Sequence, residues 1–219
     1  MPSRALNRLV WPALLLLIAV LALKTRDNFE TLFEGVGKLD ERVEPAGRTV
    51  YLRWQGKIEA PMESRIADAF ERHRSESRTF VLSLSSSGGS LDQGASVMRL
   101  LRKIGETHKI ETVVEAGSRC ASMCVPVYLQ GQRRTAAADA RFMFHEVSFR
   151  EVLAKEDIAV PATATARATD KFFNDYFRPA GVPDAWIRQV RADMDGGNDI
   201  WKTARELVDD NAGIVQQVF

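Results

Sequence analysis

Two polar residues next to apolar segments carry the main chemical signal in this sequence. Ser122 comes after the segment "IETVVEA" and opens an apolar stretch that ends at Leu129, and His145 ends the segment "RFMFH". A serine hydroxyl becomes a nucleophile when a neighbouring imidazole accepts its proton. The pair therefore suggests acyl transfer. Helix capping by Ser122 and a structural, hydrogen-bonded role for His145 are the alternatives.

A pair of glycines offers a second element of this chemistry. Gly88 and Gly89 follow the segment "LSLSSS", and glycine permits positive φ angles with which backbone N–H groups face a ligand. An ordinary strand-to-helix turn is the alternative, and a phosphate loop is disfavoured because no Gly-Lys-Ser/Thr follows. A helix that starts near Ser122 would add unpaired amides and a dipole that stabilise an oxyanion.

Cys120 and Cys124 flank Ser122 and are alternative nucleophiles. A disulfide between them would suit an oxidising compartment. Cysteines four residues apart across a helix start rarely have suitable Cβ directions, so we expect two packed thiols, although strain at the turn would permit the bond. His145 and the two cysteines make an incomplete zinc set. No metal or other cofactor is expected.

The segments around these residues alternate between strand and helix patterns. Such alternation predicts an α/β fold with mostly parallel strands, whose carboxyl edge would gather the glycine pair, Ser122 and His145. Two further helices form a helical appendage after the histidine strand. The expected strands are 49–56, 79–85, 110–116 and 140–145, and the expected helices are 61–73, 91–104, 122–129, 162–178 and 183–193.

The N-terminus has the layout of a membrane signal anchor. Two arginines precede an apolar run from Leu9 to Leu23, basic residues follow it, and no cleavage triplet is evident. The run is shorter than the roughly 20 residues of a comfortable span. We still expect residues 1–26 to be a single-pass inner-membrane anchor with the remainder in the periplasm; a cleaved, secreted form is the alternative. Residues 27–48 are interpreted as a stalk and 49–219 as the folded domain.

Composition and charge limit the possible partners. With 219 residues, of which 45% are hydrophobic, one main domain is expected. The net charge is +1, and the adjacent pair Arg133 and Arg134 lacks a basic stripe or aromatic platform around it. Nucleic acid is therefore not an expected partner. His73 and His108 lie in charged or polar segments and are interpreted as solvated.

Three motifs, taken in order, resemble the proteolytic subunit of the Clp protease family. They are "SSSGGS", "RCASMCV" and "ARFMFHEV", which are similar to the Gly-Gly loop, nucleophile turn and histidine strand of that family. The likeness spans about residues 49 to 215 and implies the ClpP/crotonase fold of repeated β-α units. It implies that Ser122, not a flanking cysteine, is the nucleophile and that His145 is the general base. The amides of Gly89 and Met123 would form the oxyanion hole, and Gly88 and Gly89 the substrate-binding loop.

The third catalytic member is expected in a loop before the last helix. The segments "DIWKTAREL" and "AGIV" are similar to the family region that holds an aspartate, which points to Asp199, with Asp193 and Asp195 as alternatives. Thr203 to Glu206, "TARE", forms a capping box and leaves Asp199 in the preceding loop. The sequence departs from the family at Ser87, where a proline is usual, in the flanking cysteines and in the anchor.

The resemblance implies a membrane-anchored serine peptidase that hydrolyses peptides or unfolded protein and forms homo-oligomers. An ATPase partner is not expected outside the cytoplasm. One alternative is a non-catalytic binding or assembly module with the same fold. Another is a Ser-Lys peptidase of the signal peptide peptidase type, with Lys155 or Lys171 as base. A crotonase-type acyl-CoA enzyme is a more distant alternative.

Overall fold

The computed structural model of the chain describes residues 37–44, 48–148 and 161–219. The predicted membrane anchor, residues 1–26, lies outside these ranges. Within them, none of the helices combines the length and the apolar composition needed to span a membrane. The folded unit begins at Gly37.

The larger of two sheets has six strands in the order β1-β2-β3-β4-β6-β9, and only β1 runs antiparallel to its neighbour. Alternate residues of β2 and β3 are buried, which is the period-2 pattern of strands with one face on a core. The strands are β1 (Lys38–Val43), β2 (Thr49–Gln55), β3 (Thr79–Ser85), β4 (Lys109–Val114), β6 (Arg133–Ala136) and β9 (Gln217–Val218).

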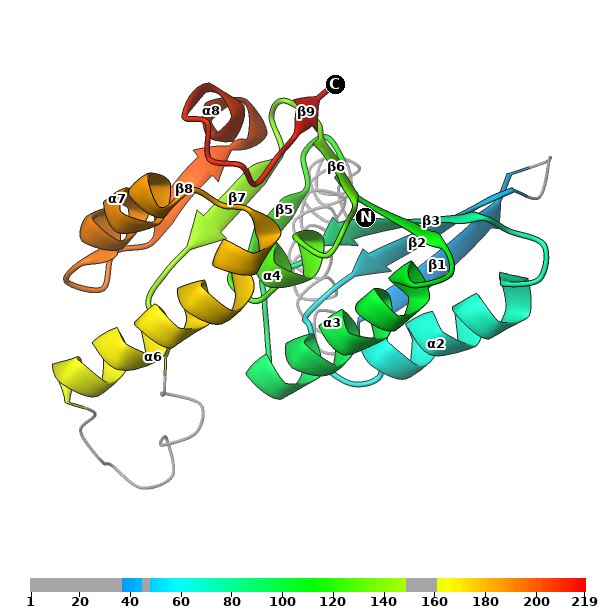
Figure 1. Cartoon of the computed structure of the whole chain (residues 1–219), viewed down its shortest axis with the longest axis horizontal. Helices are drawn as coiled ribbons and strands as arrows, with labels where there is room; N and C mark the ends of the chain where they lie inside the picture. The colour runs from blue at the N-terminus through cyan, green and yellow to red at the C-terminus, as the bar shows by residue number, and fades with distance from the viewer. Residues whose placement is uncertain (1–36, 45–47, 149–160) are drawn as a thin grey trace, which may run out of the picture. The chain divides into compact units, whose positions relative to one another are not determined.

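Two amphipathic helices pack side by side on this first sheet (Figure 1). Helix α2 (Met62–His73) buries Met62, Ile66 and Ala69, which lie on one face at helical spacing. Helix α3 (Leu91–Gly105) begins at Ser90, whose hydroxyl accepts a hydrogen bond from the Gln93 amide. The Gly88–Gly89 loop thus leads directly from β3 into a well-capped helix.

The second sheet positions the serine and the histidine. Its strands are β5 (Arg119–Ala121), β7 (Arg141–Phe144) and β8 (Ile200–Thr203), with β5 and β7 parallel and β7 and β8 antiparallel. An isolated bridge between Ser86 and Cys120 connects the end of β3 to β5. The short helix α4 (Cys124–Tyr128) follows β5. The two sheets therefore meet where the glycine loop approaches the Ser122 turn.

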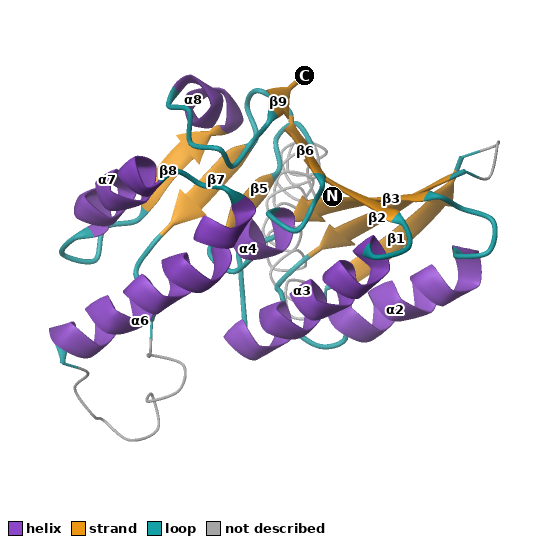
Figure 2. Cartoon of the chain, in the orientation of Figure 1, coloured by secondary structure: helices purple, strands orange, loops and turns teal. Residues whose placement is uncertain are grey.

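The chain after β7 forms the predicted helical appendage (Figure 2). Phe173 of α6 and Phe177, the residue after this helix, are buried, and Phe144 of β7 packs edge-on against Phe177 and against Trp186 of α7. The Thr203–Glu206 capping box that the sequence predicts is present at the start of α8. The elements are α6 (Ala162–Tyr176), the 3₁₀ turn η1 (Arg178–Ala180), α7 (Asp184–Met194) and α8 (Ala204–Asp209).

The predicted α/β class with a mostly parallel sheet is confirmed, but the folded domain begins earlier in the chain than predicted. Residues 38–43, which were assigned to the stalk, form β1 and pair with all six residues from Val50 to Gln55. The strand is mostly exposed, and charged side chains are common on edge strands because they discourage further pairing. Its polar composition explains why no strand was predicted there.

Candidate active site

Ser122 and His145 lie next to each other, each directly after one of the adjacent parallel strands β5 and β7. Oγ of Ser122 lies 2.7 Å from Nε2 of His145, and both residues are partly buried. Ser122 occupies the turn between β5 and α4 with φ +53°, a left-handed conformation that is uncommon for a residue with a side chain. Its amide donates to the Met143 carbonyl at 2.9 Å. The nucleophile turn is thus attached to β7, the strand that ends at His145.

The glycine loop lies directly beside this turn. Gly88 has φ +100°, and a Cβ atom added there would lie 2.7 Å from Cβ and 3.2 Å from Oγ of Ser122. Gly89 has φ +151°, and its added Cβ would lie 2.5 Å from the carbonyl oxygen of Ile58. Both positions therefore require glycine: a side chain at position 88 would collide with Ser122, and one at position 89 would collide with the backbone of Ile58.

Two backbone amides near the serine are available for a ligand. The Gly88 amide donates to Oγ of Ser86 at 3.1 Å, whereas the amides of Gly89 and Met123 donate to no acceptor in the described part of the chain. Met123 itself is the residue before α4, and its side chain is buried. Two unpaired donors close to a serine hydroxyl are what an oxyanion requires.

A cavity of about 230 Å³ opens in front of the serine and the histidine. Aromatic residues of α6 and the adjoining turn form one wall, and the glycine loop forms another. Thr169, buried in α6, accepts a hydrogen bond from the Val147 amide at 2.9 Å and so fixes the segment that follows His145. The apolar lining residues include Leu91, Met143, Phe172, Phe173 and Phe177, and the charged ones are Lys57 and Glu146.

The three candidate aspartates occupy different positions. The last pair of the β7–β8 ladder is Phe144 with Ile200, so Asp199 comes directly opposite His145 when the register is continued. The Asp199 side chain is exposed and makes no hydrogen bond or ion pair within the described ranges. Asp193 accepts from Gln189 at 2.9 Å, and Asp195 accepts from the neighbouring Gly196 amide at 3.1 Å.

The lysine alternatives gain no support from the geometry. Lys171 is 76% exposed and lies 2.7 Å from Asp175 on the same helix face. The hydrogen bond and charge of Asp175 raise the pKa of Lys171, which makes its ammonium a poorer source of a free amine base. Lys171 does not line the cavity, and Lys155 lies outside the described residues.

The remaining histidines are half-buried and have partners, so their interpretation as solvated is wrong. Nε2 of His73 lies 3.2 Å from a Glu41 carboxylate oxygen. The ring of His108 packs edge-on against Phe70 and Phe80. Neither histidine lines the cavity beside Ser122.

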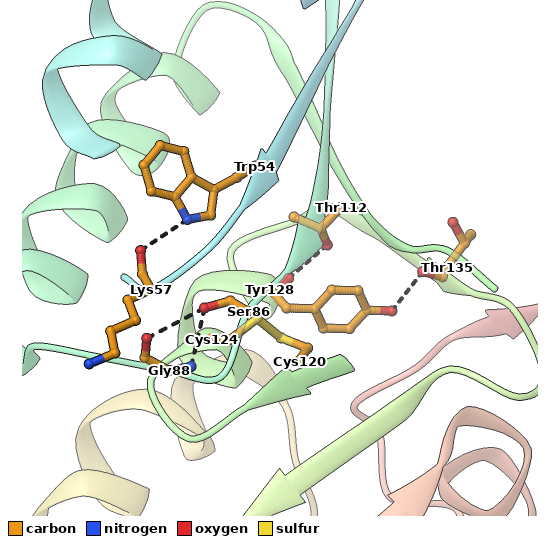
Figure 3. The surroundings of a disulfide bond; sticks show 9 residues. All are labelled: Trp54, Lys57, Ser86, Gly88, Thr112, Cys120, Cys124, Tyr128 and Thr135. Carbon is orange, nitrogen blue, oxygen red and sulfur yellow. Dashed lines mark hydrogen bonds between the residues drawn. A yellow bond between two sulfur atoms is a disulfide. The ribbon is translucent and has the colours of Figure 1, made fainter. Parts of the chain in front are cut away.

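Cys120 and Cys124 form a disulfide, so the prediction of two packed thiols is wrong (Figure 3). Their Cα atoms are 5.2 Å apart, within the range that a disulfide spans. The left-handed turn at Ser122 produces this approach, and a sequence does not reveal that a serine will adopt such a φ angle. Bonded to each other, the cysteines carry no thiolate and are not alternative nucleophiles. The described residues also contain no group of three or more His, Cys, Asp or Glu side chains arranged as metal ligands.

Comparison with known proteins assigns the chain to a family. The Clp protease family model matches residues 56–219. Among solved structures, a mutant of ClpP1 from Listeria monocytogenes is similar with a TM-score of 0.59 and 21% sequence identity, over 79% of this chain and 91% of that chain. At this identity the likeness shows the fold alone. A search of curated proteins gave no match. Because the family model spans more than half of the chain, this protein belongs to the Clp protease family.

Proposed function

We propose that this protein is a serine peptidase with Ser122 as nucleophile and His145 as general base. The observation that carries the proposal is the 2.7 Å contact between Oγ of Ser122 and Nε2 of His145 at the wall of a cavity. A hydrogen bond of this length is within the reach that proton transfer requires. Membership of the Clp protease family supports the same reaction class.

The geometry supports a two-step acyl transfer. Nε2 of His145 accepts the proton of Ser122 as Oγ bonds to the scissile carbonyl carbon, and the resulting imidazolium then donates that proton to the leaving amine. The amides of Gly89 and Met123 bind the oxyanion of each tetrahedral intermediate. A water molecule, deprotonated by His145, then hydrolyses the acyl-enzyme and regenerates Ser122.

Asp199 is the proposed third member of the triad. A base at Nε2 requires the hydrogen of a neutral imidazole to be on Nδ1, and a carboxylate partner there would hold that tautomer and stabilise the imidazolium. The support is positional: the β7–β8 ladder ends at the pair Phe144 and Ile200, and one more residue in the same register would bring Asp199 opposite His145. The proposal requires the exposed carboxylate to turn towards the ring when substrate binds.

The proposed substrate is an extended peptide or an unfolded segment. Such a segment would add as a strand beside the Gly88–Gly89 loop. The apolar wall formed by Met143 and the α6 phenylalanines suits an apolar side chain beside the scissile bond. The family relationship supports assembly as a homo-oligomer.

The proposed location is the periplasmic face of the inner membrane, with residues 1–26 as the anchor. A buried disulfide supports an oxidising compartment, and the charge pattern at the N-terminus supports the orientation. No ATPase partner is proposed, since ATP is not expected there. Thiol alkylation of cells lysed directly in denaturant, with and without prior reduction, would show whether the disulfide exists in the cell.

A fluorophosphonate probe tests the reaction class. The purified full-length chain should be labelled in the wild type, unlabelled in Ser122→Ala and labelled much more slowly in His145→Gln. Ser87→Ala is the matched control, because Ser87 is an exposed serine that lines the same cavity and should leave labelling intact. An unlabelled wild type would instead favour a non-catalytic module. The described part of the structure has no hydrogen bond between Asp199 and His145, which is also consistent with such a module.

A further inference from the structure

The Cys120–Cys124 disulfide encloses the proposed catalytic turn. Only Ala121, Ser122 and Met123 lie between the two cysteines. We propose that this disulfide is a positioning element of the active site, which holds the Ser122 hydroxyl and the Met123 amide in their reactive places; the inference rests on the proposed peptidase function. Figure 3 shows the sulfur–sulfur bond between the end of β5 and the start of α4.

The turn and the helix after it do not hold this geometry by themselves. Ser122 has φ +53°, which is sterically disfavoured for a residue with a side chain. Helix α4 has only five residues, and no side chain caps its N-terminus. Helices this short are not stable without tertiary contacts. The position of the Met123 amide therefore depends on whatever fastens the two ends of α4.

The C-terminal end of α4 is fastened by Tyr128. Its carbonyl accepts a hydrogen bond from the Thr112 hydroxyl of β4 at 2.7 Å, and its own hydroxyl donates to the Thr135 carbonyl of β6 at 3.1 Å (Figure 3). Burial raises the pKa of Tyr128, so this hydroxyl keeps its proton. At the N-terminal end the disulfide is the covalent attachment, and it acts beside the hydrogen bond from the Ser122 amide to the Met143 carbonyl.

Strand β5 also holds the glycine loop. The Ser86 amide donates to the Arg119 carbonyl at 2.8 Å, and the Ala121 amide donates to the Ser86 carbonyl at 3.0 Å. Oγ of Ser86 in turn accepts from the Gly88 amide at 3.1 Å (Figure 3). Through Cys120 the disulfide thus connects the Met123 side of the oxyanion site to the Gly89 side.

Burial protects the disulfide from reduction in the folded protein. Both cysteine side chains are 0% exposed, and thiol–disulfide exchange requires a thiolate to reach a sulfur atom. A dithiol reductant added to the native protein should therefore leave both the bond and the labelling rate unchanged. Rapid loss of labelling in the native state would overturn this part of the proposal and indicate a redox switch.

The test compares fluorophosphonate labelling rates of the full-length wild type and the double variant Cys120→Ala/Cys124→Ala, at a temperature where circular dichroism shows both to be folded. We expect labelling to slow by at least tenfold. Ile66→Ala is the matched control: Ile66 is fully buried in α2, and its truncation should lower the melting temperature without slowing labelling.

The results of these experiments distinguish a positioning role of the disulfide from a general stabilising role. A double variant labelled within twofold of the wild type would leave the disulfide with no positioning role. Equal slowing by Ile66→Ala, or a double variant that does not fold, would also overturn the inference, because the bond would then support the whole domain and not this turn. A wild type that is not labelled would refute the proposed peptidase function itself.

Discussion

Gly88→Ala is the most direct perturbation of the proposed site that leaves its chemical groups in place. The new methyl carbon would lie 2.7 Å from Cβ of Ser122 and 2.9 Å from the Ala121 carbonyl oxygen. Since carbon atoms in contact are normally about 3.5 Å apart or more, Ser122 or the loop must move by about 0.8 Å. A displacement of about 1 Å in a catalytic group lowers a rate by about 100-fold.

The same substitution also affects stability. At φ +100°, a residue with a side chain is strained by about 1–3 kcal/mol, so Gly88→Ala should lower the free energy of unfolding by that amount. Urea unfolding measures the stability, and the second-order rate of fluorophosphonate labelling measures the reactivity of Ser122. The two readouts separate a displaced nucleophile from an unfolded domain.

Gly117→Ala is the control for backbone strain alone. Gly117 has φ +68°, and a Cβ added there has no neighbour within 4 Å. Gly117→Ala should therefore lower the free energy of unfolding by about 1–2 kcal/mol and leave the labelling rate unchanged. If folded Gly88→Ala is labelled within twofold of the wild type, the close contact with Ser122 has no part in reactivity and the reasoning fails.

Three further predictions follow from single contacts. Thr112→Val removes the hydroxyl that donates to the Tyr128 carbonyl and should lower the urea unfolding free energy by about 1–3 kcal/mol; an unchanged midpoint would contradict this. Asp199→Asn should slow fluorophosphonate labelling by at least about tenfold, whereas Asp193→Asn should not, and equal rates for both would remove Asp199 from the triad. Backbone and hydroxyl hydrogen bonds from Thr203 lower the pKa of Glu206, so its ionised form stabilises the fold above the usual carboxyl pKa and that contribution is lost as the pH falls below it. Thermal melts from pH 6 to pH 3 should therefore show a larger loss for the wild type than for Glu206→Gln, and parallel losses would refute the assignment.

The long elements of this fold could be predicted from the sequence, because their patterns extend over several turns or pleats. Helices α2, α3, α6 and α7 and strands β2, β3 and β4 lie where hydrophobic periodicity places them, whereas the four-residue strand β7 is predicted from its apolar composition. The predicted helix at 122–129 is present only as Cys124–Tyr128. Strands β5, β6, β8 and β9 have two to four residues each, which is too few to establish a period of two.

Details of the candidate site depend on tertiary geometry that no local pattern records. The sequence motifs identify Ser122 and His145 as candidates, and in the structure Oγ of Ser122 lies 2.7 Å from Nε2 of His145. The proposed alignment of Asp199 with His145 requires the register of β7 and β8, which ends at Phe144 and Ile200 and must be extended by one residue. The disulfide could not be predicted, because its Cβ directions follow from the unusual φ of one serine between the two cysteines.

The division of the site between two sheets has a consequence for biosynthesis. The glycine loop follows β3 of the first sheet, whereas Ser122 and His145 belong to the second, and β8 and β9, which complete the two sheets, come after Asp199 in the chain. A ribosome-bound fragment that ends before Ile200 would already contain the serine and the histidine without the strand that flanks the histidine. The proposed hydrolase would therefore stay inert until its own synthesis is nearly finished.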